Sequence, residues 1–176
     1  MARFLGTYRI ESARLPEWDY SSSGWYFITI CTKDHVPFLG EVVDGKMNLS
    51  HIGKIVAETW PRVVNIHPGI SLDAWVVMPN HFHAIVILQE ETAGNKGRSQ
   101  SNRNWRPGSL GVIVNWFKSS CTKRIRKTGL KKFAWQSRYY DHVIRNDDDL
   151  RRIQEYILNN PERWEQDHLH PPRYSR

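Results

Sequence analysis

The chain has 176 residues, of which 40% are hydrophobic and 12% aromatic, and this content predicts one folded domain over residues 1–176 rather than a disordered chain. Twenty-five Lys and Arg residues against 18 Asp and Glu residues give a net charge of +7, which favours binding to polyanions such as nucleic acids. No apolar run approaches the ~20 residues that cross a bilayer, and the first residues lack the pattern of a signal peptide, so we expect a cytoplasmic protein without membrane partners.

The N-terminal half contains clear strand, turn and helix signals. Residues 25–32 are rich in aromatic and β-branched residues and predict a strand. An Asp-Gly pair at 44–45 is a strong signal for a hairpin turn. Residues 50–64 carry apolar residues at helical spacing, with Ser50 as the N-cap, although Pro61 weakens the last turn of this expected helix.

The middle of the chain predicts a second hairpin, a long loop and a second helix. Residues 73–78 and 81–88 are the expected strands, and a Pro-Asn turn joins them. Residues 89–107 are polar and lack apolar periodicity, which is typical of a long flexible loop. Apolar residues at helical spacing over 110–125 predict a helix whose outer face is basic.

The last third of the chain predicts a strand over 139–144 and a helix from about 148 to 159. Asn146 is the expected N-cap, the aspartates after it match the helix dipole, and Pro161 ends the helix. The elements follow the order strand, hairpin, helix, hairpin, helix, strand, helix. This order predicts an α+β fold in which helices lie beside an antiparallel sheet.

Four residues from distant parts of the chain are candidates for a catalytic site. His81 and His83 stand two apart in a predicted strand, so both side chains point to one face of the sheet. Histidine is the commonest metal ligand in proteins, although such a pair in a strand is ordinarily structural. Tyr156 and Asn160 share the flank of the apolar stripe of the last helix, which can present them to the imidazoles. Arg152, one turn before Tyr156, can bind a phosphate.

Other side chains compete for these roles. Tyr139 and Tyr140 are alternative nucleophiles, and Asp141 beside His142 suggests an acid/base pair, but adjacent strand residues face opposite ways. A second His-x-His at 168–170 precedes two prolines and is expected in an unstructured tail. The two cysteines lack metal-ligand spacing and predict free thiols.

Short distinctive segments run in order along nearly the whole chain. They are Arg14-Leu15-Pro16, Asp19-Tyr20-Ser21, Tyr26–Thr32, Trp75–His83, Phe117-Lys118-Ser119, Trp135-Gln136, Tyr139–Asn146 and Tyr156–Pro161. Together and in this order, they resemble the single-tyrosine HUH transposases of small insertion sequences and the related REP-associated tyrosine transposases.

The resemblance implies a fold and a set of site residues. The fold is a ferredoxin-like (RRM-like) antiparallel sheet with helices packed on it and with His81 and His83 on a central strand. Both histidines and Asn160 are implied to hold a divalent ion, Mg²⁺ or Mn²⁺, with Asn159 as the adjacent alternative to Asn160. The implied nucleophile is Tyr156, on the last long helix.

The resemblance also implies an activity and a partner. The activity is that of a DNA transposase, a metal-dependent endonuclease and strand transferase that acts at single-stranded DNA hairpins through a 5′-phosphotyrosine intermediate. Family members recognise hairpins of palindromic repeats, so we expect the DNA-bound protein to associate with the nucleoid. The family includes both monomers and homodimers, and the resemblance leaves both states open for this chain. Two alternatives are a DNA-hairpin-binding protein without catalysis and a metal-dependent RNA-processing nuclease that uses water.

Basic residues on the second predicted helix and in the long loop are candidates for phosphate contacts. A merely solvated face is the competing interpretation. If they bind DNA, the strength of binding should depend on salt. The candidates are Lys118, Lys123, Arg126, Arg98, Arg103 and Arg106.

Overall fold

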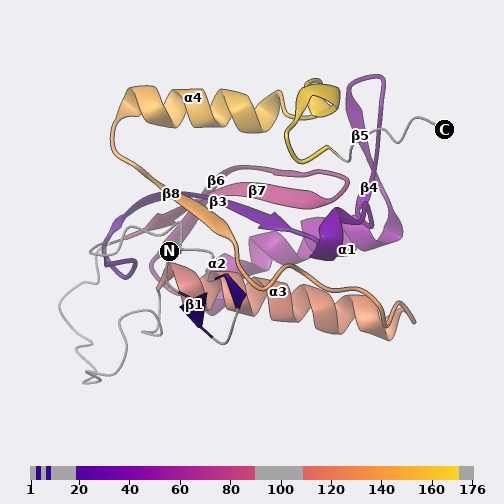
Figure 1. The fold of residues 1–176 in the computed structure, drawn as a ribbon. Helices are drawn as coiled ribbons and strands as arrows, with labels where there is room; N and C mark the ends of the chain where they lie inside the picture. Colours follow the sequence, from indigo (N-terminus) through magenta and orange to yellow (C-terminus); the bar gives the residue numbers. More distant parts are fainter. Residues whose placement is uncertain (1–2, 5–6, 9–18, 90–108, 171–176) are drawn as a thin grey trace.

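The computed structural model describes residues 3–4, 7–8, 19–89 and 109–170, and a four-stranded antiparallel sheet lies at its centre (Figure 1). The strands are β3 (Gly24–Cys31), β6 (Ile70–Val77), β7 (His81–Leu88) and β8 (Tyr140–Ile144). They lie in the order β6-β7-β3-β8, with every neighbouring pair antiparallel, so β7 is an interior strand. With one helical connection after β3 and another after β7, this order confirms the predicted ferredoxin-like topology.

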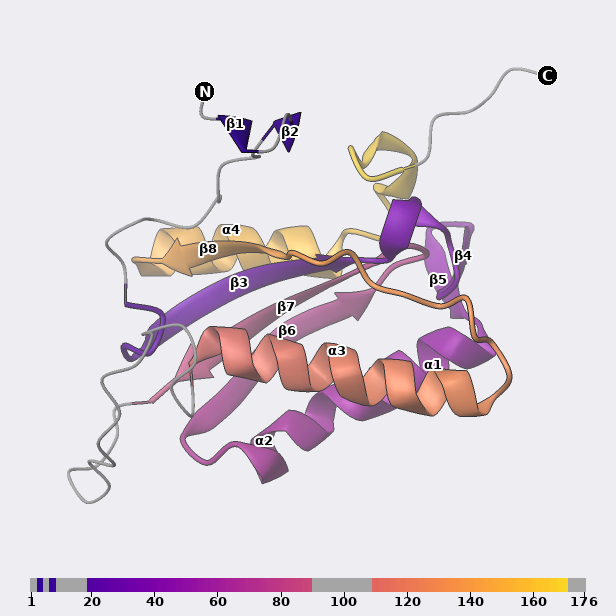
Figure 2. The same ribbon diagram turned by 60° about the horizontal axis from the view of Figure 1, so that its bottom comes forward.

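Helices cover both faces of the sheet, as Figures 1 and 2 show. On one face lie α1 (His51–Thr59), the short α2 (Val63–Ile66) and α3 (Leu110–Lys127). The opposite face carries α4 (Asp147–Leu158), which packs over that side of β3, β6 and β7. Among the described residues, three helices thus cover one face of the sheet, and α4 with the residues that follow it covers the other.

Smaller elements complete the described part of the chain. Two hairpins are β1 (Arg3–Phe4) with β2 (Thr7–Tyr8) and β4 (Gly40–Val43) with β5 (Lys46–Leu49). Three single turns of 3₁₀-helix are Lys33–His35, Trp60–Arg62 and Trp164–Gln166. In the described residues, no helix combines the length and apolar character needed to cross a membrane.

Local sequence signals account for where these elements begin and end. The hydroxyl of Ser50 accepts a hydrogen bond from the Gly53 amide and caps α1, as predicted. The helix gives way to a 3₁₀ turn that contains Pro61, which explains the weak last turn expected from the sequence. Asn146 caps α4 by accepting a hydrogen bond from the Asp149 amide.

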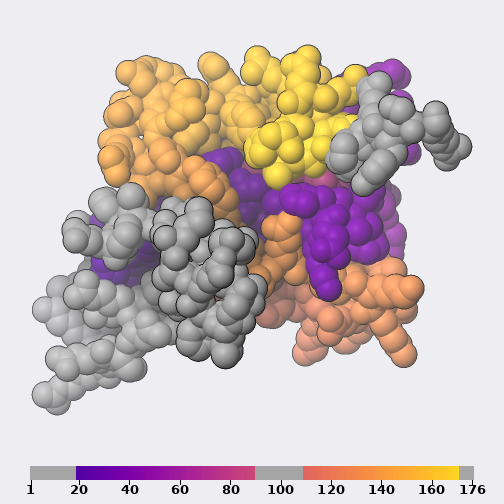
Figure 3. All heavy atoms as spheres, in the orientation of Figure 1, coloured from indigo at the N-terminus to yellow at the C-terminus, as the bar shows by residue number. Residues whose placement is uncertain are grey.

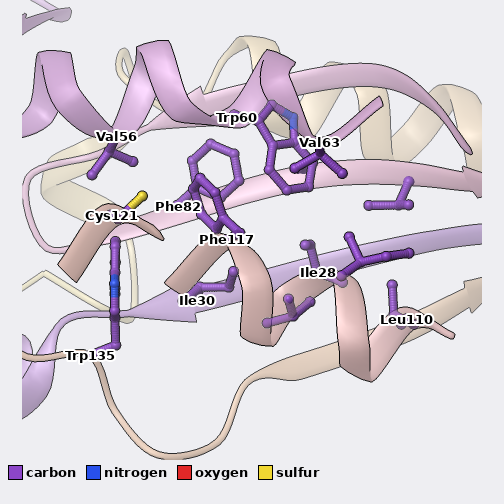
Figure 4. Close-up of a cluster of buried hydrophobic side chains, with 14 of the residues drawn as sticks. Ile28, Ile30, Val56, Trp60, Val63, Phe82, Leu110, Phe117, Cys121 and Trp135 are labelled. Atoms are coloured by element: carbon purple, nitrogen blue, oxygen red, sulfur yellow. The ribbon is translucent and has the colours of Figure 1, made fainter. Parts of the chain in front are cut away.

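The main core fills the space between the sheet and helices α1 and α3 (Figure 4). Phe82 of β7 is fully buried there, with its ring 5.0 Å from that of Trp60 and 5.0 Å from that of Phe117. Because side chains alternate along a strand, burying Phe82 on this face turns its neighbours His81 and His83 to the face under α4.

Replacing Phe82 with Ala is expected to lower the free energy of unfolding by about 3–5 kcal/mol, because it leaves a cavity between two aromatic rings. Urea unfolding measures the decrease. The matched control is Leu158→Ala on α4, whose side chain is 69% exposed and should change stability by no more than about 0.5 kcal/mol. Equal stabilities of the two variants would contradict this description of the core.

Residues after α4 are folded, so the prediction of an unstructured tail over 168–170 is wrong for these residues. Trp164 is buried, and the Leu169 carbonyl accepts a hydrogen bond of 2.8 Å from the Asn80 side chain. These contacts join the segment to a turn of the sheet far away in sequence, which no local pattern reveals. The predicted loop contacts Arg98, Arg103 and Arg106, and the segment at 14–16, lie outside the described residues.

Candidate active site

His81 and His83 lie side by side on β7, on the face that α4 covers. Their ring centroids are 4.5 Å apart, and both residues are almost completely buried, at 0% and 1% exposure. The prediction that both point to one face of a central strand is confirmed. The strand period of two, with Phe82 fixed in the opposite core, is what brings the two imidazoles together.

Each imidazole is oriented by a hydrogen bond at its Nδ1 atom. Nδ1 of His81 lies 2.8 Å from Oδ1 of Asn80, and Nδ1 of His83 lies 2.8 Å from the hydroxyl of Thr29 on β3. Phe27, two residues before Thr29, stacks on His83 at 5.3 Å. Since an Nδ1–H that donates to Asn80 leaves Nε2 unprotonated, the His81 Nε2 atom offers a lone pair to the site.

Tyr156 enters the site from α4. Its phenolic oxygen lies 3.3 Å from Nε2 of His83, and its ring stands edge-on to the rings of His83 and Phe27. The buried stripe of the helix, with Ile153 and Ile157, packs on the sheet as the sequence predicted. The predicted juxtaposition of phenol and imidazole is therefore what the structure shows.

Asn160 follows the end of α4 and reaches the same site. It is 2% exposed, its Nδ2 donates to Asp167, and its Oδ1 is buried without a hydrogen-bond partner among the described residues. Asn159, the alternative, instead lines the open cavity next to Tyr156. Of the two amides, Asn160 is the one whose oxygen is available inside the site.

Asp167 also belongs to this site, and sequence reasoning missed it. Its Oδ2 lies 3.9 Å from Nε2 of His81, and its side chain is 3% exposed. One donor atom each of His81, His83 and Asp167 lie within 4.8 Å of one another. The available signal was a carboxylate seven positions after Asn160, but a single acid outside any periodic pattern does not predict a ligand.

Burial governs the protonation of the site. It lowers the pKa of His81 to about 4, against the opposite effects of Asp167 and Asn160, and it also holds the pKa of His83 well below its usual range. Both imidazoles are therefore neutral at pH 7, the form that binds metals. Burial, reinforced by Asp167, raises the pKa of Tyr156 to about 12, while a hydrogen bond with Asn160 opposes the rise. The phenol is thus protonated in the resting protein.

The donor set fits a divalent cation. Nε2 of His81 and Oδ1 of Asn160 are buried acceptors without hydrogen-bond partners in the described part of the chain. A buried acceptor without a hydrogen bond or another polar partner destabilises the folded protein, and a cation can bind both acceptors at once. Imidazole nitrogen combined with amide and carboxylate oxygen is a donor set that suits a divalent metal such as Mn²⁺ or Mg²⁺.

A cavity of about 800 Å³ opens beside Tyr156. Three arginines line it, Arg138, Arg152 and Arg163, so the predicted Arg152 does lie at the site. Arg152 also forms an ion pair of 2.5 Å with Asp149 on its own helix. The exposed ring of Tyr140 and the half-buried ring of Tyr139 form part of the same wall. The cavity is thus basic and partly aromatic, and Tyr156 is part of its lining.

The basic residues of α3 lie away from this site, on the opposite face of the sheet (Figure 2). Lys123 and Arg126 are exposed and border a separate groove. Lys118 is half-buried, and its ammonium donates to the carbonyls of Gln136 and Ser137 at 2.5 and 3.2 Å. Lys118 therefore holds the loop before β8, while Lys123 and Arg126 remain open to a partner.

The two cysteines, Cys31 and Cys121, are buried and free, as predicted. Asp141 and His142 are separated as the sequence led us to expect, and Nε2 of His142 lies 2.7 Å from Oδ2 of Asp149 on α4. Alternation along β8 explains the separation, since adjacent residues point to opposite faces.

Comparison with known proteins gives these features a family context. No family model matches the chain. An uncharacterised protein of Haemophilus influenzae is 34% identical over 171 residues, which cover 94% of this chain and 95% of that protein. A REP-associated tyrosine transposase of Escherichia coli K12 is 36% identical over 91 residues, but these cover only 52% of this chain and 44% of that protein.

A solved structure supports the same relationship. It is described as a REP-associated tyrosine transposase bound to a REP hairpin, and it matches with a TM-score of 0.58 and 25% identity over 81% of this chain and 68% of that chain. A further protein of Haemophilus influenzae, named as a putative REP-associated tyrosine transposase, is 24% identical over 81% of this chain and 73% of its own length. In sequence and in fold, the chain is thus related to REP-associated tyrosine transposases.

Proposed function

We propose that the protein is a metal-dependent DNA strand transferase that cuts and rejoins single-stranded DNA beside hairpins, with Tyr156 as the nucleophile. The observation that carries the proposal is the position of the phenolic oxygen, 3.3 Å from Nε2 of His83, in a site that also holds two buried acceptors without hydrogen-bond partners among the described residues. The proposed nucleophile and His83, one of the proposed metal ligands, both line the same basic cavity.

His81, His83 and Asn160 are the residues proposed to hold a divalent ion. When bound, this ion supplies a positive charge that polarises the scissile phosphate and stabilises the charge that develops on it. The hydrogen bonds of Asn80 and Thr29 keep the two imidazoles in place for this role.

The proposed reaction exchanges one phosphodiester bond for another. The Tyr156 oxygen attacks the phosphorus, the bond from phosphorus to the 3′ oxygen breaks, and that oxygen takes up a proton to become a free 3′-hydroxyl. The downstream fragment stays on the protein through its 5′-phosphate, as a phosphotyrosine ester, and the 3′-hydroxyl of another strand can reverse the step. Because the pKa of Tyr156 is about 12, the phenol must lose its proton in the course of the attack.

The cavity beside Tyr156 suits the unpaired nucleotides next to a hairpin. Arg138, Arg152 and Arg163 can neutralise phosphates, and the exposed ring of Tyr140 offers a face for base stacking. The hairpin itself is proposed as the partner because the solved relative is described with a REP hairpin.

The direct test is incubation of the protein with a 3′-end-labelled DNA hairpin carrying single-stranded flanks, with Mn²⁺ or Mg²⁺, followed by a denaturing gel. A strand transferase leaves a labelled band that migrates with the protein. Cleavage without a covalent band points to the use of water, and binding without cleavage points to a non-catalytic hairpin protein. Either of these outcomes contradicts the proposal.

The exposed charges of α3 lead to a prediction for binding. Replacing both Lys123 and Arg126 with Gln is expected to weaken hairpin binding and to reduce the slope of log affinity against log salt by ~0.7 for each phosphate that the variant no longer neutralises. Fluorescence anisotropy across a salt series measures this slope. The control is Lys46→Gln, which removes an exposed charge from the β4–β5 hairpin and should leave the slope unchanged. An unchanged slope in the double variant would mean that this face of α3 is only solvated.

A further inference from the structure

The segment after α4 folds back over the candidate metal site. The Trp164 ring lies 5.8 Å from that of His81, and the Leu169 carbonyl accepts a hydrogen bond from Asn80, the residue that orients His81. In Figure 3 the yellow atoms of this segment abut purple atoms from the first part of the chain. The segment is therefore packed on the sheet, where it can contribute a side chain to the site.

Asp167 is the side chain that this segment places inside the site. Its Oδ1 accepts a hydrogen bond of 2.7 Å from the Leu169 amide, and its Oδ2 accepts one of 3.1 Å from Nδ2 of Asn160. In the described part of the chain its ion-pair contacts are with histidines, His81 and His168, rather than with Arg or Lys. A carboxylate can accept about four hydrogen bonds, so Oδ2 keeps a lone pair for another partner.

We infer that Asp167 is a ligand of the same ion, in addition to His81, His83 and Asn160. Two ligands that are each about 2.1 Å from one ion lie at most ~4.2 Å apart, and Oδ2 of Asp167 is 3.9 Å from Nε2 of His81. The inference rests on the metal site of the proposed function and adds a negatively charged ligand to that site. Two neutral imidazoles and an amide carry no net charge, and the carboxylate supplies the one negative charge that favours a hard cation over water.

Because Asn160 donates a hydrogen bond to Asp167, the carboxylate has a second conceivable role, orientation of the Asn160 amide, which must be distinguished from binding the ion. A carboxylate that only orients the Asn160 amide would be a positioning residue, and its removal would also weaken metal binding. A ligand, in contrast, sets which metals the site prefers. Replacing Asp167 with Cys substitutes a soft thiolate for a hard carboxylate, which should move the preference from Mn²⁺ toward Cd²⁺ only if the side chain touches the ion.

The experiment measures Mn²⁺ and Cd²⁺ binding by calorimetry for the wild-type protein, Asp167→Asn, Asp167→Cys and His81→Ala. Ultraviolet absorption reports any bond between thiolate and Cd²⁺. Glu162→Cys is the matched control, because it adds a thiol to an exposed position of the same segment. The wild-type protein serves as the blank for Cys31, which lines the cavity but whose pKa burial raises to about 11.

The expected results are an affinity for Mn²⁺ at least about tenfold weaker in Asp167→Asn, and a thiolate–Cd²⁺ absorption band in Asp167→Cys that Glu162→Cys lacks. Wild-type affinity for Mn²⁺ in Asp167→Asn, with binding abolished in His81→Ala, would overturn the inference and leave the proposed function standing. Binding of Cd²⁺ to Asp167→Cys without the band would likewise overturn it and leave a positioning role. Failure of the wild-type protein to bind Mn²⁺ would instead overturn the proposed metal site itself.

Discussion

Replacing Tyr156 with Phe is expected to eliminate the covalent protein–DNA adduct while hairpin binding and the fold persist. The change removes only the phenolic oxygen, which lies 3.3 Å from Nε2 of His83. The ring contacts with Phe27 and His83 remain. A denaturing gel after incubation with labelled hairpin DNA and Mn²⁺ measures the adduct, and urea unfolding should show a change of no more than about 1 kcal/mol.

The matched controls are the other tyrosines of the cavity. Tyr139 is half-buried against the main core and Tyr140 is exposed at the cavity wall, and neither is placed against the paired histidines as Tyr156 is. Tyr139→Phe and Tyr140→Phe should therefore retain the adduct. An adduct that persists in Tyr156→Phe and disappears in one of these variants would assign the nucleophile elsewhere.

Replacing His81 or His83 with Ala is expected to abolish cleavage and to leave hairpin binding largely unchanged. Each variant removes a buried nitrogen donor from the site, while the arginines that line the cavity remain to bind phosphates. Cleavage is followed on a gel across a Mn²⁺ titration, and binding is followed by anisotropy. Because both residues are buried, urea unfolding of each variant verifies that the protein still folds.

An exposed histidine provides the control for this pair. His51, at the start of α1 and exposed, should be replaceable by Ala without loss of cleavage. Undiminished cleavage in the double variant of His81 and His83 would contradict the metal role. A double variant that no longer folds would show that these buried residues serve the structure, which is the ordinary role of histidines in a strand.

The sequence could predict those parts of the site that follow from a local period. The alternation of a strand places His81 and His83 on one face, and the helical period places Tyr156 and Asn160 on one flank. Which face of the sheet would receive the last helix depends on packing between distant elements. The resemblance to a known family supplied this relationship, and the structure confirms that the phenol reaches His83.

Asp167 and Lys118 show why the remaining contacts could not be predicted. The segment of Asp167 has no apolar period, and it is held by contacts to Asn80 and His81, more than 80 positions earlier in the chain. Lys118 fits the basic face of a helix, yet its ammonium binds two carbonyls of a loop that follows the helix. Both outcomes depend on tertiary contacts, which a periodic pattern does not contain.

The identity of the nucleophile is the central claim, and peptide mapping of the trapped protein–DNA adduct tests it most directly. The adduct is formed with hairpin DNA and Mn²⁺, digested with protease and nuclease, and analysed by mass spectrometry for the residue that carries the 5′-phosphate. The proposed function predicts phosphotyrosine at Tyr156. A 5′-phosphate on Tyr139 or Tyr140 would contradict it.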